Sequence, residues 1–154
     1  MDASPDVQRQ EGAAASLLVV ENDARIVELL CMFLARRGYR VRGARTLEEA
    51  RAELERAPAD LMLSDIDLGR SNGRDFLPLL SREGLLPPTL VVSGYLDAQL
   101  ASELSGIPEI VGVLAKPFEF DSLQRRVEQA LAAVAADVRR VRQASDAALD
   151  VTVP

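Results

Sequence analysis

Four short apolar runs of the sequence each end in polar residues whose types suit phosphoryl chemistry. The run Leu17–Val20 is followed by Glu-Asn-Asp at 21–23, and later runs end in Asp65, Ser93 and Lys116. An aspartate carboxylate can act as a nucleophile toward phosphorus and form an aspartyl phosphate. A lysine ammonium and a hydroxyl can bind phosphoryl oxygens, and neighbouring carboxylates can bind Mg²⁺, which reduces the repulsion between the anions. These residue types therefore predict a site that accepts a phosphoryl group.

The composition sets the lysine apart and removes several other chemistries. Lys116 is the only lysine among 18 basic residues, which suggests that this position needs an ammonium point charge. The chain has no histidine, so Ser/His and Cys/His catalysis, histidine-ligated metals and a phosphohistidine on this chain are excluded. Its single cysteine, Cys31, rules out an internal disulfide and a cysteine zinc site. We expect Cys31 to be a small buried apolar residue.

The charge balance and the hydropathy pattern narrow the class of protein further. The net charge of −6, from 24 acidic and 18 basic residues, disfavours direct DNA binding. The amino-terminal segment is acidic and lacks an apolar centre, so no secretory signal is expected. No uninterrupted apolar run approaches the roughly 18 residues of a membrane helix. We therefore expect a cytoplasmic protein without membrane contact.

The periodicity of the sequence predicts alternating strands and helices. Apolar runs predict five strands near 17–20, 39–41, 61–64, 89–92 and 111–115. Stripes of apolar residues three and four apart predict intervening helices up to Gly38, from Thr46 to Ala57, near 74–82 and near 97–104. A last helix is predicted to begin near residue 121 and to extend to about residue 143. The turn-rich segment 65–73 is expected to be a loop.

This alternation predicts an α/β fold: a doubly wound, five-stranded parallel sheet with helices on both faces. In such sheets the functional crevice lies beyond the carboxyl ends of the strands. The acidic residues, the serine and the lysine all follow strand ends, so we expect them to converge at one edge of the sheet.

At these residues the chain resembles a known family, the receiver domain of bacterial response regulators, which has a flavodoxin-like (βα)5 fold. The resemblance covers about Ser16 to Ala133. It rests on Leu-Val-Val-Glu-Asn-Asp at 18–23, Asp-Leu-Met-Leu-Ser-Asp-Ile-Asp-Leu at 60–68, Val-Val-Ser-Gly at 91–94 and Leu-Ala-Lys-Pro-Phe at 114–118. Together these segments are highly specific.

The resemblance implies a role for each matching residue. Asp65 corresponds to the phosphoacceptor, Ser93 to the hydroxyl residue that binds the phosphoryl group, and Lys116 to the family's lysine. The residues that correspond to the family's Mg²⁺ ligands are Glu21, Asn22, Asp65 and, through its backbone carbonyl, Asp67. The family also usually has a cis bond at the Lys116-Pro117 position.

Two positions depart from the family pattern. Asn22 stands where an aspartate normally binds the metal, so one negative charge is missing and we expect weaker Mg²⁺ binding. Val113 replaces an aromatic residue that usually turns inward on activation, and a valine cannot make that rotamer change. Asp67 and Tyr95 fall at the two variable positions that, in the family, tune how long the phosphoryl group lasts.

The expected organisation is a disordered arm at 1–15, the receiver domain at 16–133 and a helical extension with a tail at 134–154. The extension carries an apolar edge and a basic cluster, which leaves a homodimer as one hypothesis. The resemblance implies a phosphoryl donor, either a sensor histidine kinase or a histidine phosphotransfer protein. It also implies an unknown downstream protein. The chain is expected to catalyse at most its own phosphorylation and hydrolysis, and is not predicted to be an enzyme acting on other substrates.

Two alternatives remain open at this point. A pseudo-receiver would bind a partner without phosphorylation; Asn22 and Val113 motivate this hypothesis, while the retention of Asp65, Ser93 and Lys116 disfavours it. A phosphatase of the haloacid dehalogenase type is suggested by Asp-Ile-Asp at 65–67. Those enzymes place that motif on the first strand, whereas here it follows the third.

Overall fold

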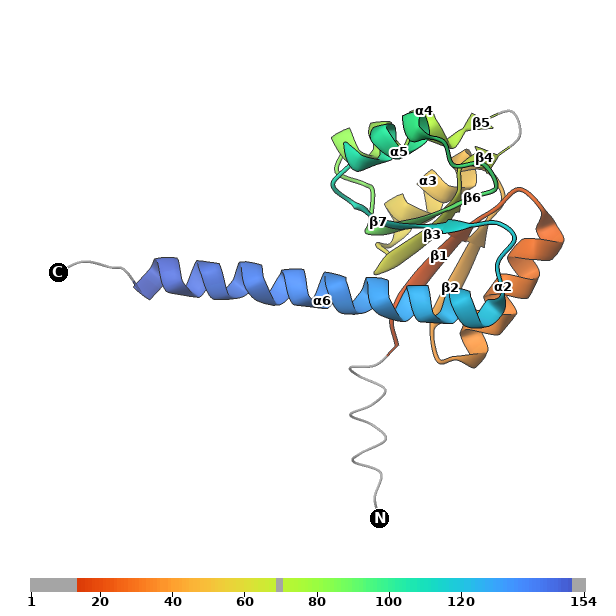
Figure 1. Ribbon diagram of the computed structural model, residues 1–154. Coiled ribbons are helices and arrows are strands. Elements are labelled where there is room, and N and C mark those ends of the chain that lie inside the picture. Colours follow the sequence, from red (N-terminus) through yellow and green to blue (C-terminus); the bar gives the residue numbers. More distant parts are fainter. Residues whose placement is uncertain (1–13, 69–70, 151–154) are drawn as a thin grey trace, which may run out of the picture.

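The computed structural model describes residues 14–68 and 71–150. Its main sheet has five parallel strands in the order β2-β1-β3-β6-β7 (Figure 1). Their bounds are β1 Ser16–Val20, β2 Arg40–Ala44, β3 Leu61–Asp65, β6 Thr89–Ser93 and β7 Ile110–Ala115. The predicted doubly wound parallel sheet is therefore confirmed.

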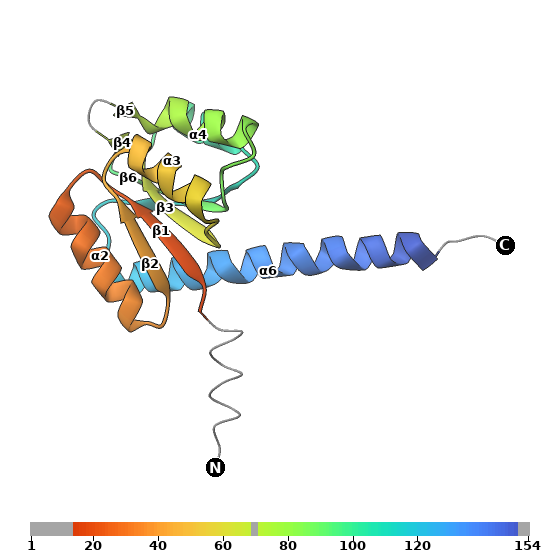
Figure 2. The same cartoon turned by 180° about the vertical axis from the view of Figure 1, so that it is seen from behind.

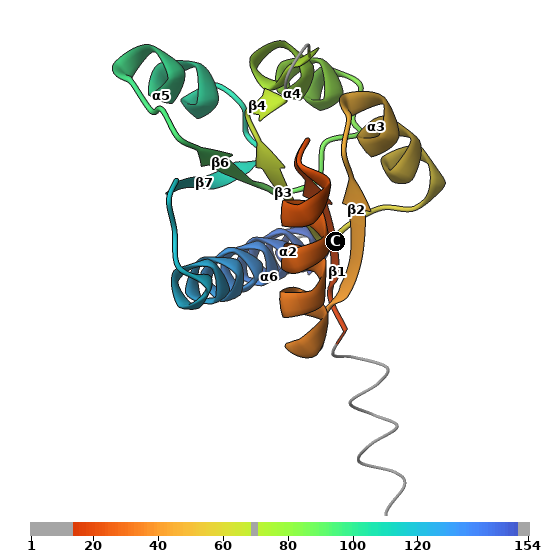
Figure 3. The same cartoon turned by 90° about the vertical axis from the view of Figure 1, so that its right-hand side faces the viewer.

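Helices cover both faces of this sheet. Figure 3 shows α2 (Ala24–Arg36) and α6 (Phe120–Asp150) on one face. The other face carries α3 (Leu47–Arg56), α4 (Gly73–Arg82) and α5 (Ala98–Ser105). Alternate residues of each central strand supply the two cores: in β1, Leu17 and Val19 pack toward α2 and α6, whereas Leu18 and Val20 pack toward the other helices.

Local capping signals set the helix boundaries. The side chain of Asp23 accepts the backbone N–H of Arg25 at the start of α2. At α3, Thr46 accepts the N–H of Glu49, and the Glu49 carboxylate accepts the N–H of residue 45 at 2.7 Å. After α2, Gly38 has a φ of 98°, a backbone conformation that favours glycine and ends the helix.

The structure differs from the prediction in two connecting regions. Within the segment expected to be a loop, β4 (Asp67–Leu68) and β5 (Ser71–Asn72) form a small antiparallel hairpin. The second strand of the sheet is Arg40–Ala44 and not 39–41. It is an edge strand with arginines at alternate positions, so it lacks the continuous apolar run that marks the central strands.

Helix α6 is longer than predicted. It spans 31 residues without interruption, and Figures 1 and 2 show it running beneath the sheet and projecting beyond it. The segment contains no glycine or proline and is rich in alanine, so nothing in it stops a helix at residue 143. The helix also crosses the proposed boundary at 133/134 without a break. Most of the predicted arm at 1–15 lies outside the described residues, and so does the end of the predicted tail, from residue 151 onward.

No helix of the described segments is both long and apolar enough to cross a membrane.

Candidate functional site

The polar residues singled out in the sequence lie at the carboxyl edge of the sheet. Asp65 and Ser93 are the last residues of β3 and β6, and Glu21 and Lys116 directly follow β1 and β7. The parallel register aligns these strand ends, since Val20 lies opposite Ser64 and Asp65 opposite Val92. Strands of matched length thus bring residues from distant parts of the chain to one edge.

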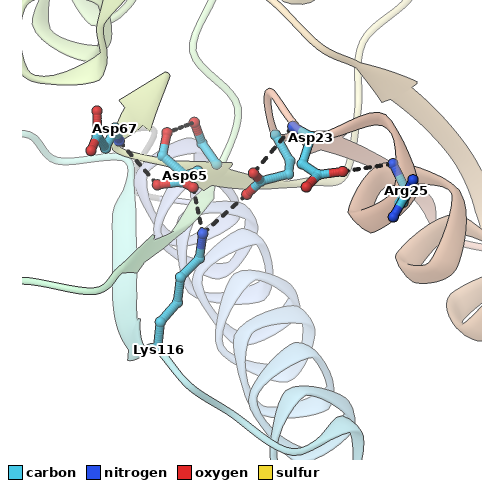
Figure 4. Close-up of polar contacts among 7 residues, drawn as sticks. Asp23, Arg25, Asp65, Asp67 and Lys116 are labelled. Carbon is cyan, nitrogen blue, oxygen red and sulfur yellow. Dashed lines mark hydrogen bonds and ion pairs between the residues drawn. The ribbon is translucent and has the colours of Figure 1, made fainter. Parts of the chain in front are cut away.

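Lys116 joins two buried carboxylates. Its Nζ donates to Asp65 Oδ2 at 2.5 Å and to Glu21 Oε2 at 3.2 Å, as Figure 4 shows for the labelled lysine and aspartate. The carboxylate side chains are each 7% exposed and the lysine side chain 31%. The only lysine of the chain is therefore used to hold two acidic groups together.

Glu21, Asp65 and Lys116 form a cluster of two acidic groups and one basic group, and its electrostatics depend on how far these groups are buried. Burial raises the pKa of Glu21, and the nearby Asp65 raises it further, while Lys116 acts in the opposite direction. Burial alone lowers the pKa of Lys116, but its hydrogen bonds and charge interactions with Asp65 and Glu21 outweigh this, and the pKa is raised. The ammonium therefore stays charged, and a further cation beside the two carboxylates would favour the charged form of Glu21.

The backbone fixes the orientation of the Asp65 carboxylate. The N–H of Asp67 donates to Asp65 Oδ1 at 3.0 Å, so each carboxylate oxygen has its own donor (Figure 4). The Lys116–Pro117 peptide bond is cis, as the resemblance implied.

Ser93 is buried beside the cluster but does not join it. Its hydroxyl accepts the backbone N–H of Tyr95 at 3.1 Å, and its carbonyl accepts the N–H of Lys116 at 2.8 Å. Among the described residues the Ser93 hydroxyl forms no hydrogen bond to Asp65. The structure therefore places Ser93 on the adjacent strand end, where its hydroxyl is turned toward the following loop.

The four predicted metal ligands divide into two pairs. Glu21 and Asp65 are buried and both accept hydrogen bonds from the Lys116 ammonium. The side chains of Asn22 and Asp67 are exposed. Within residues 14–68 and 71–150, no three histidine, cysteine, aspartate or glutamate side chains are grouped as a metal site. The donors near the cluster are all oxygens, two of them on buried carboxylates, which suits Mg²⁺ but supplies fewer charges than three acids would.

A cavity of about 360 Å³ opens beside this cluster, and the sequence did not predict it. Its wall combines the charged residues of the site with apolar residues from α2, the strands and the segment after β7. The lining residues are Val19, Val20, Glu21, Ile26, Leu30, Leu63, Asp65, Val92, Lys116, Pro117 and Phe118. The two carboxylates and the Lys116 ammonium thus share the lining of this cavity with apolar side chains.

The remaining positions discussed from the sequence lie outside this cluster. Val113 is partly buried and packs against the core beneath α3, α4 and α5. Tyr95 is 78% exposed. Cys31 is only partly buried, on α2, rather than fully buried as expected; the burial it has raises the pKa of its thiol.

Sequence comparisons identify the family. The model described as "Response regulator receiver domain" matches residues 17–128. The response regulator protein PilR of Pseudomonas aeruginosa is 31% identical over 116 residues, which cover 74% of this chain and 25% of PilR. The transcriptional regulatory protein DcuR of Escherichia coli is 32% identical over 120 residues, covering 75% of this chain and 48% of DcuR. The chain belongs to the response regulator receiver domain family.

Solved structures show the same fold. The chemotaxis protein CheY4 of Vibrio cholerae superposes with a TM-score of 0.70 at 23% identity, over 77% of this chain and 99% of that one. NtrX from Brucella abortus gives a TM-score of 0.71 at 27% identity, over 86% of this chain and 29% of that one. The chain spans between about a quarter and a half of PilR and DcuR, so it matches one part of each of those proteins. The family assignment leaves no place for the haloacid dehalogenase alternative.

Proposed function

We propose that the chain is a phosphoacceptor that receives a phosphoryl group on Asp65 from a phosphohistidine of a sensor histidine kinase or a histidine phosphotransfer protein. The observation that carries this proposal is the environment of the Asp65 carboxylate. It is buried at the end of β3, and its two oxygens accept from the Lys116 ammonium and the Asp67 N–H. A nucleophile held in one orientation beside a fixed positive charge suits transfer of an anionic group.

In the proposed step, an Asp65 oxygen forms a bond to phosphorus as the bond from phosphorus to the donor's imidazole nitrogen breaks. The imidazole leaves with the bonding electron pair and takes up a proton. Lys116 already lies within hydrogen-bond distance of Asp65, so its ammonium can bind an oxygen of the incoming group. A rotation about χ1 would turn the Ser93 hydroxyl from the Tyr95 amide toward the same group.

The residues that would hold a magnesium ion are Glu21 and Asp65 through carboxylate oxygens, Asn22 through its amide oxygen, and Asp67 through its carbonyl. A bound divalent ion would offset the repulsion between the carboxylate and the phosphoryl oxygens. The two buried carboxylates that share one ammonium support this part of the proposal. The missing charge at Asn22 supports weak binding.

We further propose that the output is a phosphorylation-dependent contact with another protein, in a bacterial cytoplasm. DcuR carries the name of a transcriptional regulatory protein, but the net charge of −6 disfavours DNA binding by this chain itself. Hydrolysis of the aspartyl phosphate would reset the protein. The chain would then promote its own phosphorylation and dephosphorylation without turning over a separate substrate.

Intact-mass measurement after incubation with acetyl phosphate and Mg²⁺ tests the proposal. We expect one added phosphoryl group on the wild type and none on the Asp65→Asn variant, which keeps the shape of the side chain and loses the nucleophilic charge. A phosphoryl group on Asp65→Asn would show that another residue is the acceptor.

The exposed amide at Asn22 favours one second candidate, a pseudo-receiver that acts without phosphorylation. No adduct on the wild type, together with an adduct on Asn22→Asp, would indicate a site disabled at the metal. No adduct on either protein would support a binding module that does not use Asp65 chemistry.

A further inference from the structure

The projecting half of α6 carries an apolar stripe that the protein's own sheet does not cover. In the first half of the helix, Leu123 and Val127 are 0% exposed because they pack against the sheet. In the second half, Val138 and Val141 are 47% and 66% exposed. Figures 1 and 2 show this second half extending past the sheet.

The buried and exposed parts of the stripe lie on the same side of the helix. At about 3.6 residues per turn, the step from Leu123 to Val141 is about five complete turns, and that from Val127 to Val138 is about three. The side of α6 that faces its own sheet therefore continues outward as the exposed stripe. Val134 is partly buried and lies between the part of the stripe that the sheet covers and the part that is exposed.

This geometry restricts how a second helix could cover the stripe. A copy of α6 placed on the stripe in the same direction and with level ends would have its first half where the receiver domain already lies. A copy of α6 that runs in the opposite direction contacts only the projecting half of the first helix, and the receiver domain of that copy lies beyond the carboxyl end of the first helix. Because the receiver domain covers the first half of the stripe, an antiparallel pair is allowed and a parallel pair with level ends is excluded.

The charges beside the stripe fit the antiparallel arrangement. Arg139, Arg142 and Asp146 follow at steps of three and four residues, so they form one row along the helix, basic first and acidic last. All three are exposed, and within the described residues none of them forms an ion pair. When two copies run in opposite directions, the same row of each lies side by side, and the arginines of one face Asp146 of the other.

We propose that the projecting half of α6 is a homodimer interface in which two copies of this chain pair antiparallel, with Val138 and Val141 at the seam and Arg142 facing Asp146 across it. The projection from Val134 to Asp150 is about 25 Å long at about 1.5 Å per residue. A contact of that length is smaller than the roughly 1,600 Å² of a standard interface, so the dimer is weak and salt-sensitive.

Sedimentation velocity of the full chain over a wide range of protein concentrations tests the proposal. We expect a reversible monomer–dimer equilibrium that the Val138→Ser/Val141→Ser double variant weakens by at least about tenfold, because the seam loses apolar burial. Leu29→Ser is the matched control: Leu29 is 53% exposed on α2, away from the stripe, and its substitution leaves the dimer unchanged.

Charge exchange then tests the direction of pairing. Arg142→Asp weakens the dimer several-fold by placing like charges together, and Arg142→Asp/Asp146→Arg restores it. A parallel pair would instead bring Arg142 next to Asp137 on the other flank, so rescue by Asp137→Arg in place of Asp146→Arg would overturn the antiparallel arrangement. A monomer at every concentration, or a dimer that the valine variant leaves intact, would overturn the interface itself.

Discussion

The carboxyl edge of the sheet contains two groups of polar residues that differ in how firmly they are held. Glu21, Asp65 and Lys116 are joined by hydrogen bonds of 2.5 and 3.2 Å, and the two acids are almost fully buried. Asn22, which follows Glu21, and Tyr95, which lies two residues after Ser93, have exposed side chains. The first group depends on the fold and contributes to it, whereas the second lies on the surface around it.

This difference explains which residues can vary without cost to the fold. A buried carboxylate that loses its partner is left charged in a poor solvent, which is costly. An exposed side chain remains solvated whatever its neighbours are, so its replacement alters stability little. Substitutions in the buried group should therefore affect both chemistry and folding, while those in the exposed group should affect chemistry alone.

The largest expected effect comes from removing the charge that joins the buried group. Lys116→Ala takes away the ammonium beside Asp65, and we expect the rate of phosphorylation by acetyl phosphate to fall by about 100-fold, the usual cost of one lost electrostatic donor. The rate is measured by intact mass over time, with circular dichroism as a check of folding.

Lys116→Arg is the control for charge alone. A guanidinium keeps the positive charge but is planar and larger than an ammonium, so we expect an intermediate rate. If Lys116→Ala were phosphorylated at the rate of the wild type, the Lys116 ammonium would have no role in the phosphorylation of Asp65.

The sequence predicted the positions of these residues better than their contacts. Buried apolar runs ending in Glu21, Asp65, Ser93 and Lys116 predicted that the four would share one edge, because parallel strands end together. Which of them touch depends on side-chain rotamers and on the few ångströms that separate neighbouring strand ends. The sequence pattern predicted neither the hydrogen bonds from Lys116 to both acids nor the hydrogen bond between the Ser93 hydroxyl and the Tyr95 amide.

The fold shows the same division between strong and weak signals. Caps such as Thr46 and the apolar stripes predicted the helices, because these signals are local. The edge strand Arg40–Ala44 lacks an apolar run, and the hairpin of β4 and β5 lies in a polar segment, so tertiary pairing decides both. The cavity beside the cluster depends on side chains from four elements and could not be read from any one of them.

A smaller effect is expected at Asn22, the exposed residue among the proposed metal ligands. Asn22→Asp adds one carboxylate beside Glu21 and Asp65, and we expect Mg²⁺ affinity to rise about tenfold, which corresponds to about 1.4 kcal/mol. Titration calorimetry measures this change. Asp67→Asn is the matched control, since Asp67 is proposed to contribute its backbone carbonyl and not its side chain. Unchanged affinity in Asn22→Asp would remove Asn22 from the ligand set.

The pH dependence of stability offers a finer test of the buried group. Burial, followed by the proximity of Asp65, raises the pKa of Glu21 above its ordinary value of 4.5. A group whose pKa is raised on folding stabilises the folded state below its unfolded pKa, and this contribution is lost as the pH rises through the folded pKa. We therefore expect the wild type to lose stability relative to Glu21→Gln as the pH is raised from about 5 to about 8.

Urea unfolding at each pH measures the difference between the two proteins. The raised pKa of Lys116 lies above its ordinary 10.5, so its titration falls outside this range. A difference between wild type and Glu21→Gln that does not change with pH would show that burial and Asp65 do not disfavour the charged form of Glu21.

The smallest expected effect on folding is at Tyr95, which follows the Ser93 strand end and is 78% exposed. Tyr95→Ala should change the free energy of unfolding by less than about 0.5 kcal/mol, because the ring packs little against the protein. The backbone N–H of this residue, which donates to Ser93, is unchanged by the substitution. We nevertheless expect a several-fold change in the lifetime of the aspartyl phosphate, because Tyr95 falls at a position that tunes this lifetime in the family. Intact mass after removal of the phosphoryl donor measures the lifetime. A change in stability without a change in lifetime would reverse the comparison, placing Tyr95 with the residues that hold the fold.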